Sequence, residues 1–206
     1  MTVPPLSPRG YGARMHGRDL ELQHEKIAGG VILRPLAAAD AFALASAYTE
    51  NRKHLEPWEP VRPESFFTTE GQAERIDGLL RQFTEGALVP WVFEAPDGRI
   101  VGAITLSGIS HGPFCSSYLG YWVAADQQNQ GLASSAVEQV CRIARDTIGL
   151  HRIEASTLTD NTGSQRVLTK CGFETIGLAP DYLHINGEWR DCRLFQRVLH
   201  DHAPVP

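Results

Sequence analysis

Three strand-like segments in a row constrain the fold more than any other feature of the chain. Residues 89–94, 100–109 and 118–123 are rich in β-branched and aromatic side chains, and the Ala-Pro-Asp-Gly sequence between the first two is typical of a hairpin turn. A segment with apolar residues at helical spacing follows at 132–148. An antiparallel meander that continues into a helix predicts a mixed sheet with helices packed against it.

The rest of the chain extends this pattern. The other predicted elements are a strand at 31–36, helices at 40–51 and 70–83, a strand at 152–158, a helix at 164–170, and strands at 173–178 and 192–199. Pro57, Pro60 and Pro63 exclude a regular helix from residues 54–65, which we expect to form a loop. The predicted fold class is therefore α+β, a single domain with a central, mixed, mostly antiparallel sheet flanked by helices.

Length and composition limit the number of domains and the kind of partner. With 206 residues, of which 42% are hydrophobic, the chain can build one substantial core. We expect this domain to cover residues 30–200, preceded by a flexible arm at 1–29 and followed by a short tail at 201–206. The formal net charge of −5 argues against direct nucleic-acid binding, because such sites are normally basic.

The cysteines and histidines show no metal-binding pattern. The chain has four cysteines without a Cys-x-x-Cys pair, and its eight histidines lack paired ligand spacing. No apolar stretch is long enough to span a bilayer, and no signal-peptide core is evident near the N-terminus. We therefore expect a metal-free protein of the reducing cytoplasm, with no membrane contact and with its cysteines packed in the core. An oligomer is possible.

The turn that precedes residues 132–148 has an unusual helix start. Gly131 stands where a helix usually begins with Ser, Thr, Asp or Asn. The first N–H groups of a helix have no internal partner, and small residues at Gly131, Ala133 and Ser134 would let a pyrophosphate approach them closely. The alternative is a glycine that merely breaks the turn, because the pattern Gln128-x-x-Gly131-x-Ala133 is neither a dinucleotide fingerprint nor a P-loop.

A second motif lies about thirty residues downstream. Together with Gln128-x-x-Gly131-x-Ala133, the segment 161–173 resembles the GNAT superfamily of N-acetyltransferases. The acetyl-CoA loop of that superfamily has the form Q/R-x-x-G-x-G/A, and its next element has the form N-x-x-S/A followed by K-x-G-F. The second element is matched here by Asn161, Ser164, Lys170, Gly172 and Phe173.

Three further stretches resemble one branch of this superfamily. Residues 50–65, 117–123 and 181–194 are similar to the RimJ/RimL branch, which acetylates the N-terminal amines of ribosomal proteins. The resemblance covers residues 31–199 and implies direct transfer, in a ternary complex, from acetyl-CoA to the N-terminal α-amine of a protein. An N-terminal alanine of a ribosomal protein is the leading acceptor. Acetylation of a small-molecule amine and a non-catalytic CoA-binding regulator are the alternatives.

The resemblance also implies where acetyl-CoA would bind. A cleft is expected between two splayed strands, one of them at residues 118–123. Backbone groups near Trp122 and Val123 would bind the pantetheine and polarise the thioester carbonyl, and Asn161 would bind the pantetheine amide. The residues expected around the pyrophosphate are Gln128, Asn129, Gln130, Gly131, Leu132, Ala133 and Ser134.

The catalytic groups depart from the usual pattern of the superfamily. Many relatives carry a tyrosine where this chain has Leu168, so Ser164 is the candidate proton donor, with helix capping as its alternative role. Asp181, in an expected late loop, is a candidate base or amine anchor, or else an ordinary loop cap. Asp191 is expected to pair with a nearby arginine.

The candidate acceptor residues are aromatic and acidic. Trp58 and Glu59 lie between two prolines. Trp58 would stack on the substrate, or could instead anchor its loop on the core, and Glu59 would attract a cationic N-terminus. Tyr121 and Tyr182 are further candidates for substrate contact. An α-amine has an unperturbed pKa of about 7.7–8.0, so it needs less help to lose its proton than a lysine does.

Overall fold

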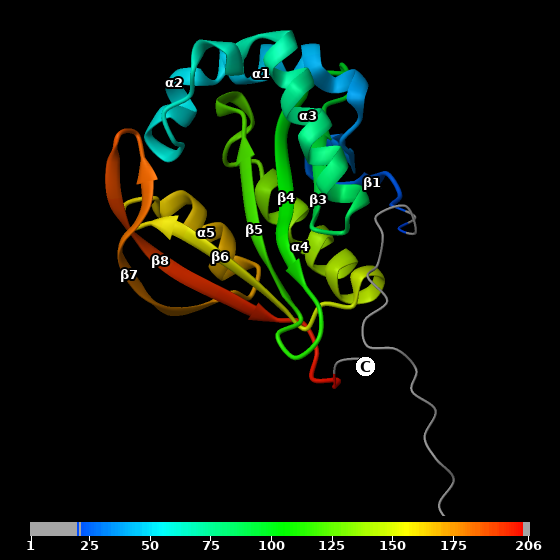
Figure 1. The fold of residues 1–206 in the computed structure, drawn as a ribbon, viewed down its shortest axis with the longest axis vertical. Coiled ribbons are helices and arrows are strands. Elements are labelled where there is room, and N and C mark those ends of the chain that lie inside the picture. The colour runs from blue at the N-terminus through cyan, green and yellow to red at the C-terminus, as the bar shows by residue number, and fades with distance from the viewer. Residues whose placement is uncertain (1–19, 21, 204–206) are drawn as a thin grey trace, which may run out of the picture.

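The computed structural model describes residues 20 and 22–203 and is built around one mixed sheet. Its eight described strands lie in the order β1-β2-β3-β4-β5-β6-β8-β7. β5 and β6 run parallel, and every other neighbouring pair in this sheet is antiparallel. Helix α3 covers one face, α4 and α5 lie behind the other, and α1 and α2 cap one end (Figure 1). The predicted α+β class is confirmed.

The strands are β1 (Glu25–Lys26), β2 (Ile32–Pro35), β3 (Leu88–Glu94), β4 (Ile100–Ser110), β5 (Ser116–Val123), β6 (Arg152–Leu158), β7 (Glu174–Ile185) and β8 (Glu188–Val198). The α-helices are α1 (Ala41–Glu50), α2 (Arg52–Leu55), α3 (Thr69–Thr84), α4 (Leu132–Ile143) and α5 (Thr162–Lys170). Single turns of other helix types are η2 (Ala28–Gly30), η3 (Ala38–Asp40), η4 (Glu56–Trp58), η5 (Glu64–Phe67), η6 (Ala125–Gln127) and η7 (Ala144–Ile148).

Two segments differ from the prediction of plain loops. Residues 54–65 contain the end of α2, the turn η4 and the start of η5, because a proline such as Pro57 is compatible with the first turn of a helix. Residues 179–191 belong mostly to the long β7–β8 hairpin. Asn186 and Gly187 close this hairpin, both with positive φ (47° and 85°), as a tight two-residue turn requires.

The start of the domain lies earlier than expected. Of the predicted arm at 1–29, residues 1–19 and 21 lie outside the described part of the chain, as do residues 204–206 of the predicted tail. β1 pairs with β2, and the side chain of Ile27 is buried in the core. Residues 25–29 therefore belong to the folded domain.

The parallel strands β5 and β6 diverge along their length. They pair only from Ser116 to Tyr118 on β5, opposite Arg152 to Glu154 on β6. Beyond this point β5 pairs only with β4, and β6 pairs only with β8. The predicted splayed strand pair is confirmed, and it leaves one edge of β5 open toward α5.

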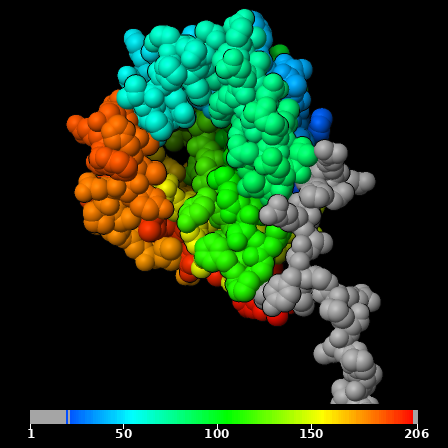
Figure 2. Space-filling view, viewed as in Figure 1, coloured from blue at the N-terminus to red at the C-terminus, as the bar shows by residue number. Residues whose placement is uncertain are grey.

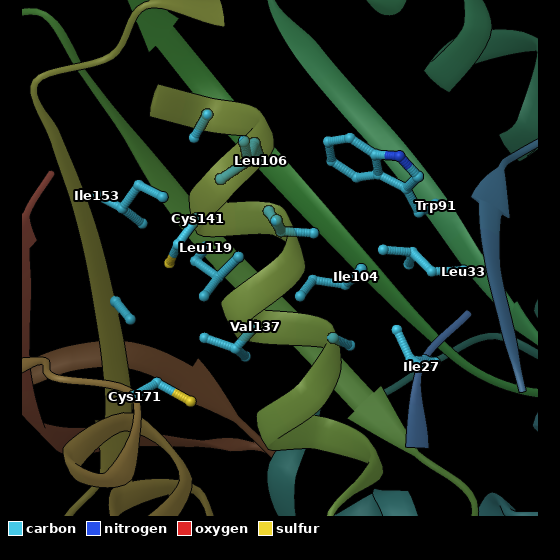
Figure 3. Close-up of a cluster of buried hydrophobic side chains, with 14 of the residues drawn as sticks. Ile27, Leu33, Trp91, Ile104, Leu106, Leu119, Val137, Cys141, Ile153 and Cys171 are labelled. Carbon is cyan, nitrogen blue, oxygen red and sulfur yellow. The ribbon is translucent and has the colours of Figure 1, made fainter. Parts of the chain in front are cut away.

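The larger part of the core lies between the sheet and α4. Val137 and Cys141 of α4 face the side chains of Leu106, Leu119 and Ile153 on three successive strands (Figure 3). All four cysteines are buried and free, as expected. A second cluster packs α1 and α3 on the opposite face of the sheet. In the described part of the chain, no helix is both long and apolar enough to cross a membrane.

Helix α1 fixes the turn that follows β5. The buried Asn51 accepts a hydrogen bond from the backbone N–H of Ala125 (2.8 Å) and donates one to the carbonyl oxygen of Ala47 (2.9 Å). The indole N–H of Trp122 donates to the hydroxyl oxygen of Tyr48 at 2.9 Å. These bonds set the position of the turn that leads to Gly131.

Candidate active site

A cavity of about 460 Å³ opens where β5 and β6 diverge. Its walls come from α2 and η4, the end of β5, the turn before α4, the first turn of α4, and α5. Figure 2 shows a hollow in the surface bordered by the α1–α2 segment, by β5 and by the β7–β8 hairpin. The cavity therefore brings together segments that are far apart in the sequence.

Most of the predicted site residues line this one cavity. They come from η4 and the residue after it, from β5, from the turn before α4, and from the starts of α4 and α5. They are Trp58, Glu59, Tyr121, Trp122, Val123, Gln128, Asn129, Gly131, Leu132, Ala133, Ser134, Asn161 and Ser164.

The start of helix α4, from Gly131 to Ser134, lines the cavity. Gly131 is the N-cap residue and has φ 77°, a left-handed conformation that favours glycine. Ser135 donates the first hydrogen bond of the helix, to the carbonyl oxygen of Gly131 at 3.0 Å. The geometry of a helix leaves the N–H groups of the three preceding residues without intrahelical partners, and Gly131 has no side chain to cap them. A helix start of this kind is suited to bind an anion without a basic side chain.

A hydroxyl pair lies where β5 faces the start of α5. The phenol oxygen of Tyr121 is 2.9 Å from Oγ of Ser164, and either group can be the donor. Burial raises the pKa of Tyr121 to about 12, so the phenol stays protonated at neutral pH. Asn161, not Ser164, caps α5, because its Oδ1 accepts the backbone N–H of Ser164 at 3.0 Å. The capping role considered for Ser164 is therefore wrong, and its hydroxyl is directed to Tyr121.

Comparison with known proteins identifies the family. The family model described as an acetyltransferase (GNAT) domain matches residues 31–174. The chain belongs to the GNAT acetyltransferase family. It is 35% identical to the ribosomal protein uS5-alanine N-acetyltransferase of Escherichia coli (strain K12), over 94% of this chain and 98% of that one. The chain is therefore an acyltransferase.

Solved structures of two GNAT relatives agree with this membership. The ribosomal-protein-S5-alanine acetyltransferase of Vibrio fischeri superposes with a TM-score of 0.81 at 32% identity, covering 84% of this chain and 96% of that chain. Mycobacterium smegmatis RimJ, solved in complex with CoA-disulfide, superposes with a TM-score of 0.80 at 32% identity, covering 86% of each chain.

Three predicted residues do not line the cavity of this GNAT domain. The side chain of Gln130 bends back and donates to the carbonyl oxygen of Asp126 at 3.0 Å. Asp181 lies in β7 rather than in a loop, at a bulge where its φ is 48°. Tyr182 is also on β7 and is partly exposed. Asp181 and Tyr182 lie on a strand because the β7–β8 hairpin continues through a segment that the sequence analysis expects to be irregular.

Asp191 has a structural role different from the expected one. Its Oδ1 accepts the backbone N–H of Asp181 at 3.0 Å and so stabilises the bulge in β7. Its neighbour Arg190 pairs instead with Asp160, with Nη2 and Oδ2 3.0 Å apart. The expected pairing of Asp191 with an arginine is not found among the described residues.

Leu168 cannot supply a hydroxyl to the cavity, because its side chain is apolar and buried. Many relatives carry a tyrosine at this position, whereas Leu168 is completely buried in the core against α4. Tyr121 of β5 brings a phenol to the start of α5, where it meets Ser164. No short sequence pattern indicates this contact, because the two partners are 43 residues apart.

Several cavity residues were missed by reasoning from the sequence. His54 is the clearest, since its Nε2 lies 3.2 Å from the carbonyl oxygen of Val123 and 3.2 Å from Nε2 of Gln128. It joins α2 to the end of β5 and to the turn that contains the glycine motif. The other missed residues are Leu55, Gln127, Gly163, Arg166, Val167 and Lys170, the last noted only as a motif position.

The loop that carries Trp58 and Glu59 is held over the cavity. The carbonyl oxygen of Glu59 accepts the backbone N–H of Asn186, at the tip of the β7–β8 hairpin, at 3.1 Å. The Glu59 carboxylate makes a single contact with Arg62, with Oε2 and Nε 3.3 Å apart. Trp58 is 37% exposed and lines the cavity, so part of its side chain is accessible to a ligand. In residues 20 and 22–203, no three His, Cys, Asp or Glu side chains gather as a metal site would require.

Proposed function

We propose that the chain transfers the acetyl group of acetyl-CoA to the N-terminal α-amine of a protein, with a ribosomal protein that begins with alanine as the leading acceptor. The main support is one cavity that contains an uncapped helix start, an open strand edge and a protonated hydroxyl pair. The Escherichia coli relative, 35% identical over nearly its whole length, is described by this activity. Such an acceptor implies a cytoplasmic reaction.

The donor would bind along the walls formed by β5, α4 and α5. Its diphosphate fits the N–H groups of Leu132, Ala133 and Ser134, since both the free donors and the helix dipole favour an anion there. Its pantetheine fits the open edge of β5 at Trp122 and Val123. The carbonyl side of Asn161 is already occupied by a cap bond, which leaves its NH₂ group free to donate to a pantetheine carbonyl.

The acceptor would enter beneath the loop of Trp58 and Glu59. A protonated N-terminus is drawn toward the carboxylate of Glu59, which is only 20% exposed and makes one ion-pair contact. The indole of Trp58 can lie against the first peptide groups of the acceptor. We assign the amine contact to Glu59 rather than to Asp181, because Asp181 is exposed on β7 outside the cavity.

The reaction needs a neutral amine and a proton for the departing thiolate. The amine nitrogen forms a bond with the thioester carbon, the C–S bond breaks, and the amine loses a proton to water or to Glu59. A backbone N–H at the end of β5 polarises the thioester oxygen. The Tyr121–Ser164 pair is protonated at neutral pH and supplies a proton to the sulfur.

The acceptor amine and the Tyr121 phenol determine the expected pH dependence of the reaction. Because only the neutral amine attacks, kcat/KM should rise about tenfold per pH unit at low pH and level off above about pH 8, the unperturbed pKa of an α-amine. Burial raises the pKa of Tyr121 to about 12, so no falling limb is expected below pH 10. Initial rates with an alanine-starting peptide between pH 6 and pH 10 measure the rising limb and the plateau. A fall between pH 8 and pH 10 would point to a different acid.

Incubation with acetyl-CoA and a peptide that has a free N-terminal alanine and one internal lysine tests the proposed function. Mass spectrometry should find one acetyl group on the α-amine, with release of one equivalent of free thiol. The same peptide with a blocked N-terminus is the control and should stay unmodified. Acetylation of spermidine or free amino acids but not of the peptide would overturn the proposal, as would an absence of thiol release.

A further inference from the structure

Two basic side chains on α5 form a site that the proposed function leaves unused. We propose that Arg166 and Lys170 bind the 3′-phosphate of CoA and so let the enzyme distinguish CoA from dephospho-CoA. This inference rests on the proposed use of acetyl-CoA, and it concerns a part of the donor that takes no part in the chemistry. Both residues line the cavity that also contains the first turn of α4.

Arg166 and Lys170 are placed so that both side chains can contact the same small anion. Residues four apart on a helix share one face, so the guanidinium of Arg166 and the ammonium of Lys170 can reach the same ligand. An arginine can donate two parallel hydrogen bonds to a phosphate, whereas a lysine contributes a mobile point charge.

The end of α5 is fixed beside the start of α4. The thiol of Cys171, the residue next to Lys170, lies 3.4 Å from the carbonyl oxygen of Ser134 in the first turn of α4. The two helices lie on the same face of the sheet, behind it in Figure 1. In CoA one ribose separates the 3′-phosphate from the diphosphate. A diphosphate on the first turn of α4 therefore brings the 3′-phosphate toward this face of α5.

The charges of Arg166 and Lys170 are available to a ligand. In the described part of the chain, neither residue takes part in an ion pair or a side-chain hydrogen bond, although other basic residues nearby do. Arg197, for example, pairs with Glu138 at 2.8 Å. Both side chains are exposed at the rim of the cavity, in a chain whose formal net charge is −5. A phosphate monoester carries nearly two negative charges at pH 7 and is the complementary group.

Calorimetry with CoA and dephospho-CoA separates this subsite from the rest of the donor site. The parent protein should bind CoA more tightly than dephospho-CoA, by roughly tenfold or more. Arg166→Gln and Lys170→Gln should each weaken CoA binding about fivefold, a modest effect because the groups are exposed, and leave dephospho-CoA binding unchanged. The double variant should bind the two compounds equally. Arg81→Gln, which removes an exposed charge from α3, is the matched control and should change neither affinity.

The possible outcomes separate the subsite from the proposed function. Equal affinity of the parent protein for CoA and dephospho-CoA would overturn the subsite while leaving acetyl transfer intact. Equal weakening of both compounds by Arg166→Gln or Lys170→Gln would also overturn it, since the residues would then not recognise the 3′-phosphate. Failure of the parent protein to bind either compound would reject the proposed function itself.

Discussion

Replacement of Gly131 by alanine should weaken CoA binding at least about tenfold and destabilise the fold by only about 1–2 kcal/mol, the cost of a left-handed conformation in a residue that has a Cβ. Gly131 has φ 77° at the N-cap of α4, and an added Cβ would meet no protein atom within 4 Å. Because no neighbouring atom blocks the added methyl group, the backbone strain is the main cost of the change. We expect the first turn of α4 to rotate and relieve this strain, which would turn its N–H groups away from the proposed diphosphate site.

Gly149 offers a matched control for this change. It has φ 76°, and a Cβ there would also meet nothing within 4 Å, but it lies at the opposite end of the same helical segment, after η7. Gly149→Ala should therefore cost similar stability in a urea unfolding titration and leave the calorimetric Kd for CoA unchanged. If the two variants lost affinity equally, or if Gly131→Ala kept full affinity, the diphosphate would not bind at this helix start.

Removal of the phenol hydroxyl by Tyr121→Phe should lower kcat about a hundredfold, the lower range for loss of a positioned proton donor. The hydroxyl of Tyr121 lies 2.9 Å from Oγ of Ser164, and burial raises its pKa to about 12. Ser164→Ala should have a similar effect, and the double variant should be little worse than either single one, because the two groups act as a unit. The calorimetric Kd for CoA should stay within about threefold of the parent value, since the hydroxyl pair contributes little to binding the cosubstrate.

Tyr118→Phe is the control for loss of a phenol on the same strand. Tyr118 lies three residues earlier on β5, is 44% exposed, and has its pKa raised mainly by the negative charge of Glu154. Its hydroxyl is outside the cavity, so steady-state kinetics with acetyl-CoA should show an unchanged kcat. A Tyr121→Phe variant as active as the parent would exclude the hydroxyl pair as the proton source.

The part of the cavity that we propose for acetyl-CoA could be predicted from the sequence because its two motifs are local. The glycine pattern around Gly131 and the segment from Asn161 to Phe173 each lie within one turn and one helix, and the structure places both on one cavity. The positive φ of Gly131 follows from its position between a strand and a helix. The mixed sheet could also be predicted from the sequence, because its strands are recognisable by their composition and by the short turns between them.

The contacts that join the walls of the cavity could not be predicted in the same way, because they are long-range. Tyr121 meets Ser164 across 43 residues, and His54 meets Val123 across 69, so no short pattern links the partners. Asp181 was assigned to a loop because the tight turn at Asn186 and Gly187 was not recognised as the end of a hairpin. Because Asn161 caps α5, the hydroxyl of Ser164 is available for Tyr121, a partner that no sequence pattern indicates.

The hydrogen bond between Glu59 and Asn186 has a topological consequence for the acceptor. Strand pairing joins this hairpin to β6 and β6 to β5, and the hydrogen bond from Trp122 to Tyr48 joins β5 to α1. The chain then runs from α1 through α2 to Glu59, so these segments form a closed ring. The middle of an extended polypeptide cannot be laid sideways into a closed ring, whereas a free end can be threaded through it. A substrate with an unfolded leading segment would thus reach the thioester without any hinge motion of the enzyme.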